Sequence, residues 1–349
     1  MVRLALGWCL LFVLLSAISS AIQENPLSGR PTQNMNFSQT FKDHAQLIGM
    51  NLSGLDLSGT DLNQSELQGS DLRRTNLNRS FLVQAIISNA KLIGANLSGA
   101  FMPAVDLHGS DLSHADLRGA YLPISYMIGS NLTGADLSGS FMDQSMVDNS
   151  TLVGAKLNGA SLWAVKISNA NLSGASFIRA LMDRSTLQNS LLFGANLTGA
   201  SLVGANLINA TISNADLSGA DISESRCSRA NFFGSRLVNS KLGFANLTGT
   251  NFSMANLSGS YLTASHLDGS DLSQANLTGA NLENALMLRV RLVEAKLIGA
   301  ILARAHLEDS DLSNCDLEKA DLTGALLSGA NLTDANLNGA RLLGADLRA

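Results

Sequence analysis

Residues 195–219 read ANLTG ASLVG ANLIN ATISN ADLSG, and this five-residue unit decides the fold. The unit continues in one register from Ala45 to the C-terminus, and every fifth residue from Leu47 to Leu347 is apolar, most often leucine. The residue two positions before each apolar centre is usually Ala or Ser. A spacing of five would carry an apolar stripe around an α-helix instead of keeping it on one face, so the pattern excludes an amphipathic helix.

The unit, written A(D/N)LxG, resembles that of the pentapeptide-repeat family. The resemblance implies an all-β fold, a right-handed quadrilateral parallel β-helix in which four units make one coil. For residues 45–349 this predicts a pentapeptide-repeat solenoid of about 15 coils. Within each unit we expect the apolar centre and the small residue two positions before it to point inward, and the other three residues to point outward.

Each unit must also turn a corner, at the second position after its centre. Gly94 and Gly134 supply the positive φ of a type II turn there, and Asn149 is of a type that tolerates it. On the side that holds Leu82, six successive coils lack both residue types at this corner, so the sequence predicts a turn without positive φ there. The residues at that corner are Gln84, Ala104, Ile124, Gln144, Ala164 and Arg184.

The N-terminal segment predicts export. Residues 1–21 have the features of a signal peptide, with Arg3 before an apolar run at residues 4–15 and with Ser19 and Ala21 as small residues at the cleavage site. Residues 22–44 are interpreted as a leader and N-terminal cap, and residues 45–349 as the β-helix. Exported members of the family are known from cyanobacteria and the thylakoid lumen, so the resemblance implies the periplasm or thylakoid lumen, or secretion.

The charge of the chain excludes several partners. The net charge is −5, and loss of Arg3 with the signal would make it −6. Nucleic acid and anionic membrane both require concentrated positive charge, so neither is expected as a main partner, and no membrane contact is expected after signal cleavage. Cys227 and Cys315 fall on inward positions and are expected to be buried thiols.

The sequence predicts no enzyme and no cofactor, catalytic or metal site. Stacked in rows of twenty, Ser88, Asp106 and His108 come nearest to a hydrolase constellation, but we interpret them as solvated residues on an open face without a pocket. His266 and His306 share a column with a leucine between them, and no further ligand converges there.

One outward column carries aromatic residues in four successive coils, whereas the other outward columns are expected to be polar. Two interpretations remain open: the rings stabilise an exposed sheet by stacking, or they form a partner surface or a place where the leader folds back. The candidate partner surface, called the aromatic face below, comprises Phe81, Phe101, Pro103, Tyr121, Pro123, Tyr126, Phe141 and Trp163.

Three classes of function follow. The first is a non-catalytic exported scaffold or interaction protein that binds a protein partner through the aromatic face. The second is implied by the family, some of whose members mimic DNA and protect gyrase; the signal peptide and the mixed charge of the column from Asn96 to Arg236 disfavour it. The third is an enzyme. The last coil carries no capping element, so we also expect a weak homodimer through the C-terminal coil.

Overall fold

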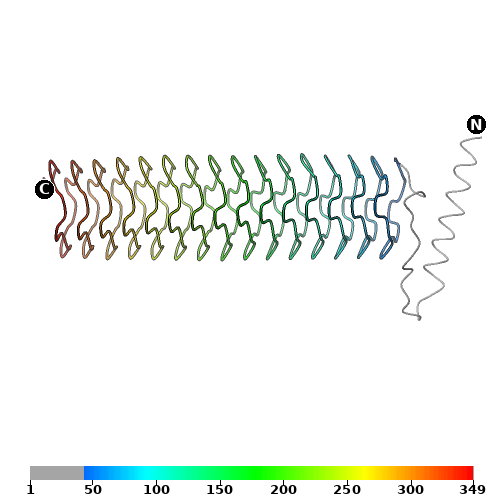
Figure 1. Ribbon diagram of the computed structural model, residues 1–349, viewed down its shortest axis with the longest axis horizontal. Coiled ribbons are helices and arrows are strands. Elements are labelled where there is room, and N and C mark those ends of the chain that lie inside the picture. Colours follow the sequence, from blue (N-terminus) through cyan, green and yellow to red (C-terminus); the bar gives the residue numbers. More distant parts are fainter. Residues whose placement is uncertain (1–42, 349) are drawn as a thin grey trace, which may run out of the picture.

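A computed structural model of the protein describes residues 43–348, and the predicted signal peptide and most of the predicted leader lie outside this range. These residues wind into a straight right-handed solenoid whose coils follow one another along the axis from the N-terminal to the C-terminal end (Figure 1). No helix or continuous strand is found between Asp43 and Arg348; the sheets are built from single-residue parallel bridges, from Gln46 with Glu66 to Leu326 with Asp346. The same range contains no helix long and apolar enough to cross a membrane.

The bridges set the register. Each joins a residue to the one twenty positions further on, so four five-residue units make one coil and the predicted quadrilateral β-helix is confirmed. In the unit that ends at Gly99, the N–H groups of Asn96, Leu97 and Gly99 donate to the neighbouring coils at 2.7–2.9 Å. The N–H of Ala100 closes the corner by donating to the carbonyl of Leu97 at 3.0 Å. Of each five N–H groups, the ladder therefore leaves one unpaired, at the position directly after the apolar centre.

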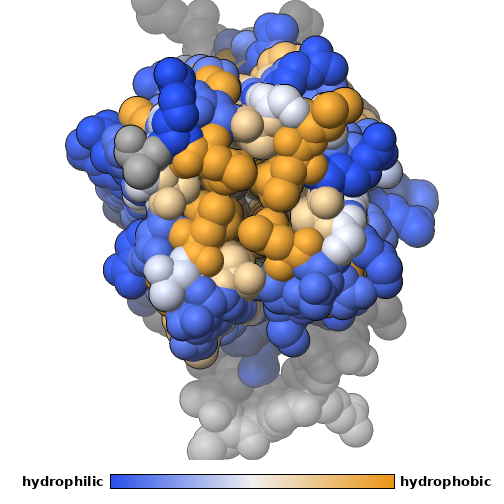
Figure 2. Space-filling model, turned by 90° about the vertical axis from the view of Figure 1, so that its left-hand side faces the viewer, coloured by the Kyte–Doolittle hydropathy of each residue, from blue (hydrophilic) through white to orange (hydrophobic). Residues whose placement is uncertain are grey.

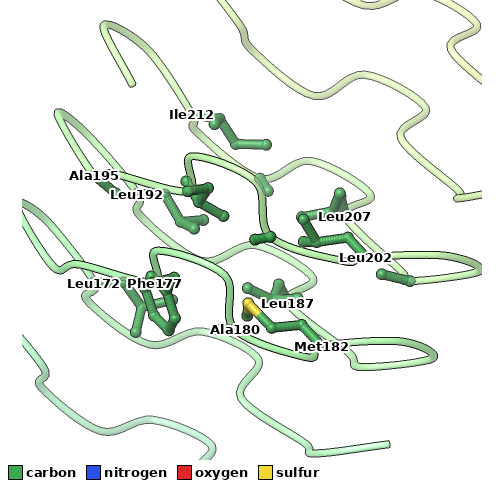
Figure 3. Close-up of a cluster of buried hydrophobic side chains, with 14 of the residues drawn as sticks. Leu172, Phe177, Ala180, Met182, Leu187, Leu192, Ala195, Leu202, Leu207 and Ile212 are labelled. Atoms are coloured by element: carbon green, nitrogen blue, oxygen red, sulfur yellow. The ribbon is translucent and has the colours of Figure 1, made fainter. Parts of the chain in front are cut away.

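The interior holds the two residue classes that the sequence predicts. Apolar centres twenty residues apart stack on one another, as Leu172, Leu192 and Ile212 do in Figure 3. The small positions are buried as well, and a serine there finds a backbone acceptor: the hydroxyl of Ser110 donates to the carbonyl of Ile87 at 2.7 Å. Serine at this position is not always satisfied, because the buried hydroxyls of Ser70, Ser140, Ser185 and Ser265 have no hydrogen-bond partner among residues 43–348.

The predicted corner without positive φ is wrong. Gln84, Ala104, Ile124, Gln144, Ala164 and Arg184 have φ between 52° and 59°, in the left-handed region. The N–H of Ala85 donates to the carbonyl of Leu82 at 3.1 Å, which completes the same type II turn as at the glycine corners. Closure of a four-sided coil fixes the backbone at all four corners, so the residue type at a corner decides only the conformational strain there.

The coil at the C-terminal end of the described residues exposes its core. Figure 2 views this end and shows apolar side chains at the centre of a hydrophilic ring. The apolar centre Leu347 is 52% exposed, whereas the centres Leu47 and Leu52 in the first coil are at most 1% exposed. The N–H groups of Leu332, Leu337 and Leu342, which lie in this end coil, have no backbone acceptor among residues 43–348.

Candidate functional site

The aromatic column consists of Phe81, Phe101, Tyr121 and Phe141, which occupy one position in four successive coils. Phe101 and Tyr121 stack in parallel, with ring centroids 5.1 Å apart and an interplanar angle of 3°. Phe81 meets Phe101 edge-on at 6.4 Å, and Tyr121 meets Phe141 in a tilted arrangement at 6.0 Å. Each ring remains 41–49% exposed, so the column offers continuous aromatic edges to solvent.

Two prolines explain how the aromatic residues are accommodated. Where an Asn or Asp stands directly before the centre, its side chain accepts the one N–H that the ladder leaves free: Asn96 Oδ1 accepts from the N–H of Ser98 at 3.1 Å. A phenylalanine or tyrosine cannot accept this bond. In the units of Phe101 and Tyr121 the free N–H is absent, because Pro103 and Pro123 occupy its position. Proline also suits the second position of a type II turn.

The other two aromatic units have no proline after the centre, and within residues 43–348 only the first of them has its N–H at that position hydrogen-bonded. The N–H of Val83, in the unit of Phe81, donates to Asn63 Oδ1 of the preceding coil at 2.7 Å. Asp143, in the unit of Phe141, accepts from the N–H of Trp163 at 2.9 Å and from the hydroxyl of Ser161 at 2.6 Å. Three of the four aromatic units thus lack an unsatisfied N–H after the apolar centre. Two of them use a proline in the same unit, and the third uses an acceptor from the preceding coil.

A hollow lies beside the aromatic column, on the next side of the coil. It has a volume of about 450 Å³ and is lined by Asp106, His108, Tyr126 and Ile128. Asp106 Oδ1 lies 2.6 Å from His108 Nδ1. The hollow therefore joins an apolar wall to a carboxylate at the edge of the aromatic face.

Sequence reasoning missed part of the exposed apolar surface. Leu181 continues the aromatic column two coils beyond Phe141 and is 53% exposed. The prediction that all other outward columns are polar is wrong, because a second apolar group lies elsewhere on the rod. Its members are Leu191, Phe193 and Phe233, which are 38–55% exposed. Tyr261 lies further along the aromatic column itself and Phe244 at the corner of the same side, and they are 54% and 67% exposed. All five residues stand in the rows of twenty that the sequence analysis uses.

The interpretation of Ser88, Asp106 and His108 as residues on an open face is also wrong in one respect. Ser88 is only 4% exposed, and the hollow described above lies beside the other two residues. Within the described range no hydrogen bond joins the Ser88 hydroxyl to His108, so the three residues do not form a relay.

The two cysteines are buried free thiols, as predicted. Burial raises the pKa of Cys227 to about 12 and that of Cys315 to about 12, so both stay protonated at neutral pH. Cys315 Sγ donates to the carbonyl of Leu292 at 2.7 Å. Over residues 43–348, no three His, Cys, Asp or Glu side chains converge on a point that could hold a metal ion.

A second hollow, of about 530 Å³, is lined by Ser53, Gly54, Arg73, Arg74 and Ile93. The Arg73 guanidinium is engaged by Asp71, at 2.5 Å. The hydrogen bond from Arg73 lowers the pKa of Asp71. Of the two arginines that line the hollow, Arg73 is therefore paired with a carboxylate.

The column from Asn96 to Arg236, on which DNA mimicry would depend, is continuous but has mixed charge. Parallel bridges connect Asp136 to Lys156 and Asp216 to Arg236 in one line. The guanidinium of Arg118 binds Asp116 in the same column at 2.6 Å and lowers the pKa of that carboxyl. Cations thus interrupt the row of carboxylates that a DNA mimic needs.

Comparisons with known proteins agree with the fold. A family model described as pentapeptide repeats (8 copies) matches residues 43–79, 85–122, 125–163, 155–199, 190–226, 225–263, 255–287, 291–329 and 325–349. No curated protein matches the chain.

Three solved structures illustrate the similarity. HetL, a pentapeptide repeat protein involved in heterocyst differentiation regulation from the cyanobacterium Nostoc sp. strain PCC 7120, is 31% identical, with 66% of this chain and 89% of HetL covered and a TM-score of 0.27. A pentapeptide repeat protein of the Arabidopsis thaliana thylakoid lumen is 26% identical, with 33% and 70% covered and a TM-score of 0.23. QnrB1, a plasmid-mediated fluoroquinolone resistance protein, is 20% identical, with 60% and 87% covered and a TM-score of 0.33.

Proposed function

Since this chain belongs to the pentapeptide-repeat family, we propose that it is a non-catalytic exported scaffold that binds a protein partner through its aromatic face. The observation that carries the proposal is the pairing of the aromatic column with Pro103 and Pro123. In these two units an exposed aromatic residue stands where Asn or Asp elsewhere satisfies a backbone N–H, and the proline removes that N–H. The two residues together give an exposed aromatic surface without an unpaired backbone group.

The physical chemistry of the surface fits protein recognition. Aromatic side chains supply large contact areas at a low cost in conformational entropy, and contiguous exposed apolar patches of a few hundred Å² mark partner surfaces. The rod holds the rings at a fixed spacing through its backbone ladder. A partner would therefore meet a pre-organised surface and lose little free energy in ordering it.

The test compares two triple variants. In the first, Phe101, Tyr121 and Phe141 are replaced by Ser; in the matched control, Asn96, Asp116 and Asp136 of the same three coils are replaced by Ser on the neighbouring side. Partners captured from the native compartment by crosslinking are identified and then measured with purified components. We expect the aromatic variant to lose at least tenfold in affinity and the control to lose less than threefold. Equal binding by both variants would remove the aromatic face from the proposal.

Export is tested separately. A fusion of residues 1–30 to a reporter should be exported and cut near Ala21, so that N-terminal sequencing begins at Ile22. A reporter that stays in the cytoplasm would instead favour the gyrase alternative. That alternative has its own test, because the interrupted charge of the column containing Lys156 and Arg236 predicts little inhibition of DNA supercoiling by the purified protein.

We also propose weak tail-to-tail pairing for a protein that ends at Ala349. The coil that holds Leu342 and Leu347 presents apolar side chains and unpaired N–H groups (Figure 2), and an open strand edge is a template for a second chain. A two-fold contact would close as a dimer. Sedimentation over a concentration series should show reversible dimerisation that Leu342→Lys with Leu343→Lys abolishes; a dimer that survives these substitutions would contradict the proposal.

A further inference from the structure

The aromatic face lies on the side of the coil where the chain enters the rod. The N–H of His44 donates to the carbonyl of Asn63 at 2.8 Å, so residues 43–44 occupy the corner of this side in the first coil. Phe81 and Tyr121 follow in the next coils of the same side. Residues 22–42, which lie outside the described range, therefore begin at one end of the exposed aromatic column.

From Phe81 to Phe141 the charge around the aromatic face has one sign, whereas the coil of Trp163 adds Lys166. This part of the face and its hollow occupy two adjacent sides of the coil, in residues 60–69, 80–89, 100–109, 120–129 and 140–149. These residues include no Lys or Arg, and their carboxylates are Asp61, Glu66, Asp106, Asp143 and Asp148. The surface is thus both aromatic and acidic, which fits an extended segment that carries apolar side chains and positive charge.

The chain's own leader has this chemistry. Residues 26–31 read PLSGRP, and Met35 and Phe37 follow. Between Ile22 and Lys42 the charged side chains are Glu24, Arg30 and Lys42, so the segment is cationic, and cleavage after Ala21 would add an amino terminus. The prolines favour the extended polyproline II conformation, which aromatic surfaces bind at a low cost in ordering entropy.

The length of the leader is sufficient. Tyr121 lies four coils from the entry point, about 19 Å along the axis at the usual strand spacing of about 4.8 Å. The eleven residues from Thr32 to Lys42 span up to about 36 Å when extended, which allows a path that first crosses the end of the rod. From Asn25, the leader reaches as far as Trp163, six coils from the entry point, or about 29 Å.

We propose that residues 25–37 of this chain lie along the aromatic face, with Arg30 against Asp106 in the hollow and Pro26 beside Trp163. The inference rests on the proposed function, since it makes the leader the resident occupant that a protein partner must displace. A tethered segment is favoured over a second copy of the chain because a short tether supplies a millimolar effective concentration.

The chain offers a built-in reporter for the test. Its two tryptophans are Trp8 and Trp163, so a protein that begins at Ile22 has a single tryptophan, on the aromatic face and 41% exposed. Cys227 and Cys315 are buried, and their raised pKa values keep them protonated. A nitroxide placed on Asn25→Cys would therefore be the only label, and it quenches tryptophan emission only at short range.

We expect the label on Asn25→Cys to quench at least half of the Trp163 emission, with no dependence on protein concentration. The same label on Thr333→Cys, about eight coils away, is the control and should quench little. Replacing Phe101, Tyr121 and Phe141 by Ser, or Arg30 by Glu, should restore the emission, and combining Asp106→Arg with Arg30→Glu should bring quenching back. Quenching no greater than in the control, or quenching that rises with concentration, would overturn the proposal.

The outcomes separate this inference from the proposed function. If the leader occupies the face, Arg30→Glu should strengthen partner binding several-fold, because the competing segment is released. Absence of quenching, with partner binding still lost on aromatic substitution, would overturn the leader's role and leave the partner surface intact. Quenching without any partner that depends on the aromatic residues would overturn the proposed function and support the leader contact.

Discussion

Two neighbouring outward columns have the same backbone ladder, but their side chains relate to it differently. The polar column, Asp56, Asn76, Asn96, Asp116 and Asp136, satisfies backbone N–H groups within its own units and also bonds along the column, as in the 2.8 Å contact from Asn76 Nδ2 to Asp56 Oδ1. The aromatic column, Phe81 to Phe141 on the adjacent side, accepts no backbone hydrogen bond. The polar column therefore stabilises the rod, whereas the aromatic column leaves its side chains free for another molecule.

Truncating a core leucine should lower the stability of the fold by the same amount beneath either column. This is the largest of the expected effects. Leu97→Ala lies beneath the polar column and Leu122→Ala beneath the aromatic column, and each leucine is fully buried. Each substitution should lower the free energy of unfolding by about 2–5 kcal/mol, through lost burial and a residual cavity. Chemical denaturation measures the losses, and hydrogen exchange should show that neighbouring coils loosen more than distant ones. Uniform loss of protection along the rod would contradict this.

Truncating one side chain in each column should show that the polar column contributes more to stability than the aromatic column does. Asn96→Ala removes the acceptor of the Ser98 N–H and hydroxyl and the donor to Asn76, so we expect a loss of about 1–2 kcal/mol. Phe101→Ala removes only ring contacts and should cost no more than about 1 kcal/mol. Adding Ser98→Pro to Asn96→Ala should recover part of the loss, because it removes the unpaired N–H as Pro103 does. No recovery would mean that the prolines of the aromatic face have another role.

Substitutions at the corners that follow the two columns should change the stability of the fold in opposite directions. Gly119 and Ile124 sit at adjacent corners of one coil with φ of 63° and 57°. A Cβ added at Gly119 would meet no atom within 4 Å, so only backbone strain is tested there. We expect Ile124→Gly to stabilise and Gly119→Ala to destabilise the fold, each by about 0.5–1 kcal/mol. Thermal unfolding measures both, and a destabilised Ile124→Gly would show that the isoleucine side chain contributes more than its strain costs.

Acid should reduce the stabilisation that the polar column contributes and leave that of the aromatic column unchanged. This is the smallest of the expected effects. The Arg118 side-chain hydrogen bond lowers the pKa of Asp116 below its unfolded value of about 3.9. The resulting stabilisation is complete above that unfolded value and is lost as pH falls through the lower folded value. The difference in unfolding midpoint between wild type and Asp116→Asn should therefore shrink from pH 7 to pH 2. The effect of Phe101→Ser should stay constant over this range, since no ring of that column titrates there.

The sequence was sufficient for most of the fold and for the location of the aromatic face. Strict repetition turns a distance of twenty residues into direct contact, so the repeat by itself places Phe101 and Tyr121 side by side. The prediction for the corner at Ile124 is wrong because closure of the coil, and not residue preference, fixes the backbone there. The role of Pro103 required the hydrogen-bond ladder, because the sequence alone does not say which N–H is left free.

The uninterrupted twenty-residue register also restricts how such a chain can change in length. Removing one five-residue unit would shift every later unit onto the next side, so that residues beyond the deletion turn by a quarter of a circle relative to those before it. A deletion between Tyr121 and Phe141 would split the aromatic face over two sides, although the core would still close. Only gains or losses of whole coils lengthen or shorten the rod while keeping each side's residues in line.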